Sequence, residues 1–208
     1  MKKYKKTIEN LVYSNILRDE RIIDAFIKTY RSQFLPEDLK NLSHLDEAFP
    51  IGHCQTISQP LTVAILLELL QPKLGNKILE IGYGSGWVTA ILSRIIGPKG
   101  KIYAYEIISE LASFGQENIK NHFEKIPENI NLIAGDYENT FHENSPYDRV
   151  LSSAAFSNTP KNLCASLSDR GIFVFPTNKN DIRVVERRGE KFIEDVIPGF
   201  VFVPITHK

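Results

Sequence analysis

The stretch Lys77-Ile78-Leu79-Glu80-Ile81-Gly82-Tyr83-Gly84-Ser85-Gly86-Trp87 decides the fold of this chain. Residues 77–81 form a short apolar run next to turn residues, which is the pattern of a buried strand. Glycines follow at alternate positions, and a helical pattern then runs from Trp87 to Ile96. A strand, a glycine turn and a helix in this order are typical of the first unit of an open α/β sheet.

The chain after this unit continues to alternate between strand and helix. We expect strands at 101–106, 131–134, 149–153, 171–176, 182–187 and 192–203. We expect helices at 60–70, from Ser109 (as its cap) to about Phe123, and near 161–167. The turn Arg188-Gly189-Glu190-Lys191 joins the last two strands as a hairpin. The alternation predicts a doubly wound, mostly parallel, Rossmann-like α/β sheet with an antiparallel C-terminal edge.

The residues before the sheet have the pattern of helices without strands between them. Apolar residues recur at helical spacing over 7–48, and Asp19 is placed to cap the second helix of this region. We therefore expect 1–57 to form a helical cap on a core of residues 58–208. A chain of 208 residues sets a prior of one domain, so 1–208 is taken as a single domain.

Composition excludes several classes of protein. Lys+Arg and Asp+Glu number 25 each, so the chain lacks the basic excess of a protein that binds nucleic acid or an anionic membrane. Apolar runs are too short to span a bilayer, and the first residues do not read as a signal peptide. The five histidines show no metal-ligand spacing, and two cysteines make no disulfide framework. We expect a cytoplasmic monomer that binds no metal, nucleic acid or membrane.

Acidic residues at the strand ends indicate the ligand of the glycine turn. The glycines are spaced G-x-G-x-G, not G-x-G-x-x-G as in a dinucleotide fold, and Glu80 precedes them. A carboxylate there repels a pyrophosphate and suits a cation. Glu106 ends the next strand, where it can accept both hydroxyls of a ribose, and Asp136 follows the third. This combination fits S-adenosylmethionine better than the alternative, in which the acids and glycines only shape strand ends.

The chain also resembles the protein-L-isoaspartate O-methyltransferase family along essentially its whole length. The most specific segment is Gln55-Thr56-Ile57-Ser58-Gln59-Pro60, and the glycine turn is shared by many methyltransferases. The other matching segments are 31–36, 45–52, 147–150, 153–155 and 202–205. The resemblance implies methyl transfer from S-adenosylmethionine to the free carboxylate of an isoaspartyl residue in a damaged peptide or protein. The ester then collapses to a succinimide, which begins repair.

The resemblance also implies roles for individual residues. Ser58 matches the active-site serine, and its neighbours line the cofactor. The expected cofactor-binding residues are Gln55, Thr56, Ile57, Ser58, Glu80, Gly82, Gly84, Glu106, Ile107, Asp136, Tyr137 and Thr206. A carboxylate acceptor is already ionised at pH 7 and needs no general base, so Ser58 is expected to orient it by a hydrogen bond. The alternative for Ser58 is a helix N-cap.

Four positions depart from the family pattern: Cys54, Tyr137, Phe156 and Asn178. Cys54, Phe156 and Asn178 motivate a second hypothesis, in which the same cofactor serves another carboxylate, such as a normal aspartate in a modified peptide. A third hypothesis is a catalytically silent module that binds cofactor or peptide. A nicotinamide dehydrogenase is disfavoured by the glycine spacing and by Glu80.

Overall fold

The computed structural model describes residues 2–205, and the predicted sheet is present. Seven strands lie in the order β5-β4-β3-β6-β7-β8-β9. The strands are β3 (Lys77–Ile81), β4 (Lys101–Glu106), β5 (Ile130–Ala134), β6 (Tyr147–Ser152), β7 (Leu167–Thr177), β8 (Asp181–Arg188) and β9 (Lys191–Pro198). The first five are parallel, and β8 and β9 are antiparallel, as predicted. The order reverses between β3 and β6, which is where an open α/β sheet binds its ligand.

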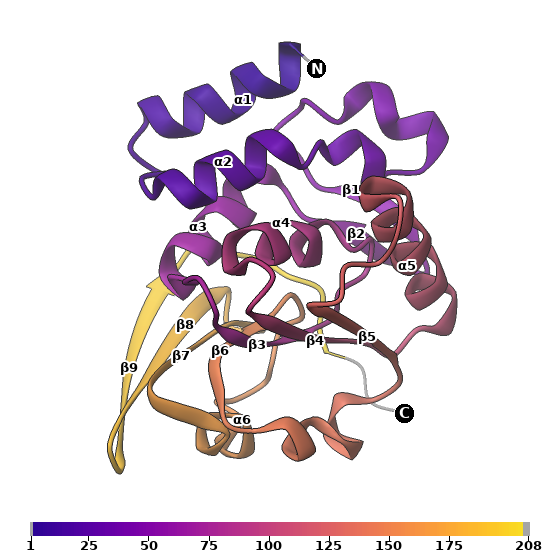
Figure 1. Ribbon diagram of the computed structural model, residues 1–208. Helices are drawn as coiled ribbons and strands as arrows, with labels where there is room; N and C mark the ends of the chain where they lie inside the picture. Colours follow the sequence, from indigo (N-terminus) through magenta and orange to yellow (C-terminus); the bar gives the residue numbers. More distant parts are fainter. Residues whose placement is uncertain (1, 206–208) are drawn as a thin grey trace.

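Helices cover both faces of the sheet (Figure 1). One face carries α3 (Pro60–Leu70), α4 (Trp87–Ile96) and α5 (Ser109–Phe123), and α1 (Lys2–Tyr13) and α2 (Glu20–Lys28) are stacked outside them. The other face carries α6 (Lys161–Ala165) and the short 3-10 helices η3 (Tyr137–Asn139) and η4 (Phe141–Asn144). Two more 3-10 helices, η1 (Arg31–Phe34) and η2 (Glu37–Leu42), lead to the hairpin of β1 (Phe49–Gly52) and β2 (Gln55–Ile57).

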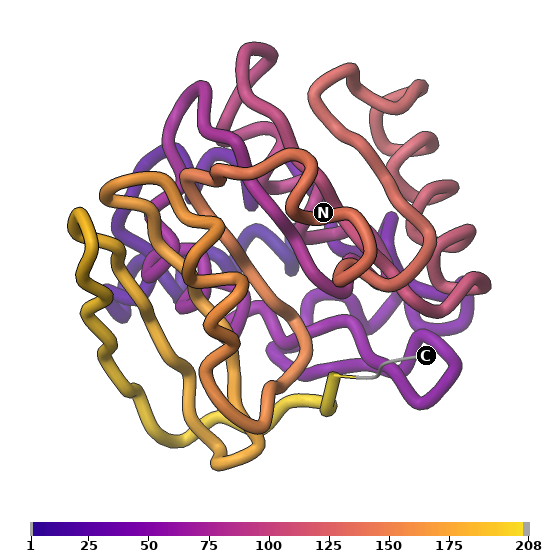
Figure 2. The backbone as a smooth tube through the Cα atoms, turned by 90° about the horizontal axis from the view of Figure 1, so that it is seen from below, coloured from indigo at the N-terminus to yellow at the C-terminus, as the bar shows by residue number. Residues whose placement is uncertain are grey.

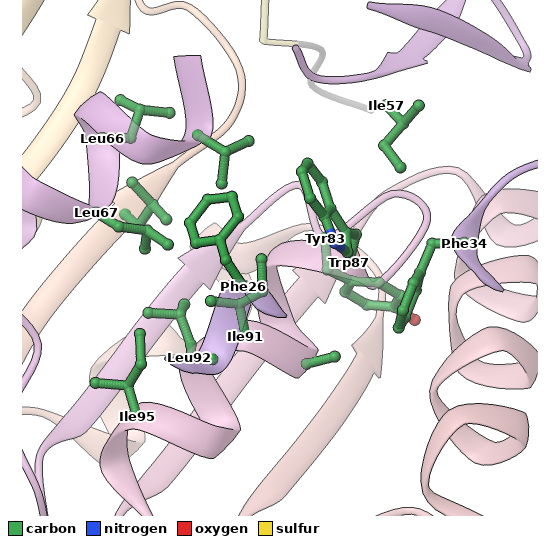
Figure 3. Close-up of a cluster of buried hydrophobic side chains, with 14 of the residues drawn as sticks. Phe26, Phe34, Ile57, Leu66, Leu67, Tyr83, Trp87, Ile91, Leu92 and Ile95 are labelled. Carbon is green, nitrogen blue, oxygen red and sulfur yellow. The ribbon is translucent and has the colours of Figure 1, made fainter. Parts of the chain in front are cut away.

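The alternation of side chains along the strands divides the core in two. Ile78 and Ile102 point to the face of α3, α4 and α5, whereas Leu79 and Tyr105 point to the other face. The first cluster also takes in α1 and α2, so the N-terminal helices share a core with the sheet. Figure 3 shows this cluster, in which Phe26 of α2 meets Trp87 of α4 edge to face at 5.7 Å between ring centroids.

Two predicted helix caps have different outcomes. Asp19 caps α2 as predicted, since its carboxylate accepts a hydrogen bond from the Arg21 amide. Ser109 does not cap α5, because it is the first helical residue and its hydroxyl donates to Glu110. The carboxylate of Glu106 accepts from the Ile108 amide at 3.0 Å instead.

The C-terminal strand is shorter than predicted. It ends at Pro198, not at Val203, because Gly199 turns the chain with φ of +100° and the Gly199 and Phe200 amides both donate to Asn180. The chain then runs back along the carboxyl edge of the sheet toward the β1–β2 hairpin (Figure 2). There it adds a short parallel bridge, Ala155 to Pro204, beside the end of β6. No helix within residues 2–205 is long and apolar enough to cross a membrane.

Candidate active site at the carboxyl edge of the sheet

The glycine turn after β3 is held against both β4 and α5. The amides of Gly82 and Tyr83 both donate to the Tyr105 carbonyl, and Gly84 has φ of +47°, which favours glycine. The Gly84 carbonyl faces Gly115 of α5 so closely that a Cβ on Gly115 would lie 2.3 Å from it. The packing of α5 therefore fixes the turn. This close approach is possible only because residue 115 is a glycine, which has no side chain.

Glu106 ties this turn to the next strand. Its carboxylate is 6% exposed and accepts hydrogen bonds from the Gly84 amide at 2.9 Å and from the Ile108 amide at 3.0 Å. Each carboxylate oxygen keeps a second lone pair. Glu106 is thus held rigidly at the sheet edge with capacity to accept further hydrogen bonds.

A cavity of about 470 Å³ lies in front of these groups. Its walls include most of the predicted site residues: Gln55, Thr56, Ser58, Gly82, Gly84, Glu106, Ile107, Asp136 and Tyr137. Wall residues that were not among the expected site residues include Ala48, Ile51, Gln59, Thr62, Ser153, Ala154 and 201–205. Residues 201–205 thus form one side of the cavity, and the predicted site residue Thr206 lies outside the described residues.

Two predicted residues do not line the cavity. Ile57 is 3% exposed and belongs to the apolar core. Glu80 is fully buried and lies beside Thr89 of α4. In β3 it shares a face with Ile78, so its side chain points beneath the glycine turn. Burial, with a smaller effect of Glu106, raises the pKa of Glu80 to about 8.

The charge of the cavity wall is one-sided. Glu106 and Asp136 both contribute carboxylates, whereas no lysine, arginine or histidine of residues 2–205 lines the cavity. Asp136 is partly fixed, since its side chain accepts from the Glu138 amide at 3.0 Å and caps η3. Such a wall suits a cationic ligand with hydroxyl and amine donors, and it repels a pyrophosphate.

Ser58 also lines the cavity and comes from the segment between β2 and α3. The N-cap of α3 is Gln59, and the Leu61 amide donates to Asp46 at 2.8 Å. The N-cap alternative for Ser58 is therefore wrong. Its hydroxyl has no hydrogen-bond partner within residues 2–205, while its carbonyl accepts from Arg31 at 2.9 Å. The Ser58 hydroxyl remains available to a ligand.

Comparison with known proteins assigns the chain to a family. The family model for protein-L-isoaspartate(D-aspartate) O-methyltransferase (PCMT) matches residues 2–208. The chain belongs to this family. Proteins named protein-L-isoaspartate O-methyltransferase include one from Fervidobacterium nodosum, 36% identical over 95% of this chain and 98% of the relative. Another, from Pyrococcus horikoshii, is 34% identical over 98% of this chain and 92% of the relative.

A solved structure shares the fold over the whole chain. It is a Plasmodium falciparum protein assigned as a protein-L-isoaspartate O-methyltransferase, in complex with S-adenosyl-L-homocysteine. The TM-score is 0.86 at 21% identity, with 98% of each chain covered. The Rossmann-like methyltransferase fold is thereby confirmed.

The departures from the family pattern mostly lie away from the cavity. Cys54 is exposed in the β1–β2 turn, and Asn178 is exposed after β7. Phe156 is 5% exposed and packs edge to face on Phe173 and Phe175. Tyr137 does line the cavity, on the side of Asp136. Three of the four departures therefore do not line the cavity.

Some features of the site gave no signal in the sequence. Gln59 is held between Asp46, which accepts from its amide nitrogen at 3.0 Å, and Thr62, whose hydroxyl donates to its amide oxygen at 3.3 Å. The first of these contacts joins residues 13 apart in the chain, and only the fold reveals it. Within residues 2–205, no cluster of metal-ligating side chains is present.

Proposed function

We propose that this protein transfers a methyl group from S-adenosylmethionine to the free carboxylate of L-isoaspartyl residues in damaged proteins and peptides, which initiates their repair. Family membership over residues 2–208 supports the activity. The single structural observation that carries it is the cavity at the strand ends, with two carboxylates and no cation on its described walls. Its chemistry fits the ammonium, sulfonium and ribose hydroxyls of this cofactor.

Different residues of the cavity wall would bind the cofactor and the methyl acceptor. Glu106 would accept from the ribose hydroxyls, Asp136 would accept from the adenine amine, and Tyr137 would shield the adenine edge. Gly82 and Gly84 let the cofactor approach the backbone. Bound there, the sulfonium supplies an activated methyl group. The Ser58 hydroxyl, which has no partner among the described residues, would donate to the acceptor carboxylate and fix its direction.

This arrangement makes positioning the main contribution to catalysis. The acceptor carboxylate is ionised at neutral pH, so no proton has to be removed before attack. Holding the nucleophile in line with the methyl group converts a bimolecular step into an effectively unimolecular one. Ile51, Val203 and Ile205 make part of the wall apolar, which would reduce the hydration of the reacting groups once both ligands are bound.

The remaining parts of the proposal concern how the protein works in the cell. Cap and core share one apolar cluster, which supports treating 1–208 as a single domain. Cys54 and Cys164 are both free, which suits a reducing compartment such as the cytoplasm. We propose a monomer that needs no metal and binds neither nucleic acid nor membrane.

One experiment tests the activity directly. A short peptide is made in isoaspartyl and normal aspartyl forms, and transfer of labelled methyl groups from S-adenosylmethionine is measured. Labelling of the isoaspartyl form alone is expected. Labelling of the aspartyl form would indicate a redirected acceptor site, and binding of cofactor without labelling of either would indicate a silent module.

A further inference from the structure

Arg31 is a buried guanidinium directly behind Ser58. It is the first residue of η1 and is 0% exposed. Its guanidinium donates only to main-chain carbonyls: Leu45 at 3.2 Å, Glu47 at 2.6 Å, Ile57 at 3.4 Å and Ser58 at 2.9 Å. One side chain thus joins the loop before β1 to the segment that carries Ser58.

The charge of Arg31 has no paired carboxylate. None of the ion pairs between residues 2–205 includes Arg31, and Asp46 acts on it only from farther away. The guanidinium lies over the rings of Phe49 and Trp87, at 5.2 and 5.4 Å from their centroids. Trp87 and Phe34 of the surrounding apolar cluster are labelled in Figure 3. Burial lowers the pKa of Arg31 to about 10, so it stays protonated at neutral pH.

An unpaired buried cation is expensive, and apolar residues or a neutral donor would cost less. The cavity wall gives a reason for a positive charge at this place. Glu106 and Asp136 make the cavity favourable for a cationic cofactor but unfavourable for an anionic acceptor. The Arg31 guanidinium contacts the main chain of the wall residue Ser58, and no lysine, arginine or histidine of the described residues lines the cavity itself.

We propose that Arg31 is a positioning residue for the methyl acceptor. It holds the main chain of Ser58, and its charge offsets the acids so that a carboxylate can bind at the Ser58 hydroxyl. This inference rests on the proposed function, since it assumes a carboxylate acceptor. The competing role is purely structural, in which Arg31 only ties two segments together through hydrogen bonds.

Two substitutions separate charge from hydrogen bonding. Arg31→Lys keeps the charge but cannot serve all four carbonyls, and Arg31→Gln keeps donors without the charge. Both are expected to lower the melting temperature. Arg31→Gln should raise KM for an isoaspartyl peptide about tenfold, while Arg31→Lys should stay within about threefold of the wild type. The affinity for S-adenosylhomocysteine should change less than about twofold in both.

Arg149 supplies the matched control. It is also a buried arginine (6% exposed) whose guanidinium donates to main-chain carbonyls, those of Gln71 and Asp148. It lies on β6 opposite Ile78, toward the amino end of the sheet and away from the cavity. Arg149→Gln should lower the melting temperature without changing the peptide KM, so a loss of stability alone does not imitate the effect expected at Arg31.

The measurements are the peptide KM and kcat, and the dissociation constant of the peptide from the protein loaded with S-adenosylhomocysteine. An equal rise in KM in Arg31→Lys and Arg31→Gln, or no rise in either, would overturn the inference. If Arg31→Gln does not fold, Arg31→Lys decides: a tenfold rise in its KM contradicts the charge role. A wild-type protein that neither labels nor binds the isoaspartyl peptide would overturn the proposed function as well, whereas normal wild-type activity with unaffected variants would overturn only the role of Arg31.

Discussion

The cavity has two halves that are held in place by different kinds of contact. The strand-end half consists of residues at the ends of β3, β4 and β5, and backbone hydrogen bonds of the sheet and Glu106 fix it. The loop half consists of residues within 48–62 and of 201–205. Two charged side chains, Arg31 and Asp46, hold the first segment, and main-chain hydrogen bonds to Ala155 hold the second. We propose that the strand-end half, which the fold itself holds, provides most of the cofactor contacts, and that the loop half, which depends on a few side chains, positions the acceptor.

The largest expected effect concerns Glu80, which lies beneath the glycine turn of the strand-end half. Glu80 has a pKa raised to about 8, chiefly by burial, so the folded protein keeps a proton that the unfolded chain loses. Without cofactor, stability should fall as pH rises from the ordinary carboxyl pKa to about 8, by at most about 1.4 kcal/mol per pH unit, and then level off. Glu80→Gln should abolish this fall.

Thermal unfolding of both proteins between pH 5 and pH 9 measures this. The exposed Glu128 provides a control, since Glu128→Gln should unfold with the pH dependence of the wild type. Curves for wild type and Glu80→Gln that run parallel over the whole range would mean that Glu80 is ionised in the folded protein.

The next effect concerns Glu106, which lines the cavity in the same half. Glu106→Ala removes the acceptor for the ribose hydroxyls and the link between Gly84 and Ile108, so cofactor binding should weaken by about 1.5–3 kcal/mol. Calorimetric titration with S-adenosylhomocysteine measures it. Glu143→Ala removes an exposed carboxylate of η4 and should leave the affinity unchanged. An unchanged dissociation constant in Glu106→Ala would refute the assignment.

A smaller effect is expected in the loop half. Ser58→Ala removes one hydrogen bond to a charged acceptor, so kcat should fall by roughly tenfold, with the affinity for S-adenosylhomocysteine nearly unchanged. Ser157→Ala removes an exposed hydroxyl and serves as the control. If Ser58→Ala lowers only the melting temperature, the residue has a structural role and not a catalytic one.

The smallest effect tests a departure from the family pattern. Cys54 has φ of +56° in an exposed turn and does not line the cavity. Cys54→Gly should therefore stabilise the protein by up to about 1 kcal/mol, because glycine adopts this conformation without strain. The peptide KM should stay within about twofold. A severalfold change in KM would instead show that the turn contacts the acceptor.

The two halves also differ in how far the sequence predicts them. The strand-end half follows from local patterns: the helix from Trp87 to Ile96 and the strand from Lys101 to Glu106 have the predicted bounds, and Glu106 and Asp136 lie at the cavity as expected. Glu80 is the exception. It was expected at the cofactor because it precedes the glycine turn, but in β3 its side chain points beneath that turn and is fully buried.

The loop half could be predicted only through the family resemblance. Ser58 and its neighbours were expected there, but the contacts that hold them join residues far apart in the chain, such as Arg31 with Ser58 and Asp46 with Leu61. Their carbonyl and amide partners belong to the main chain, which carries no sequence signal. The turn at Gly199, which sends the chain end back to the cavity, depends on pairing with Asn180 and was missed for the same reason.

The central claim is that the charge of the strand-end half selects a cationic methyl donor and not a dinucleotide. Parallel titrations of the wild-type protein with S-adenosylmethionine and with a nicotinamide dinucleotide test it most directly. The account predicts saturable binding of S-adenosylmethionine and none of the dinucleotide. Tight binding of the dinucleotide with no affinity for S-adenosylmethionine would contradict it.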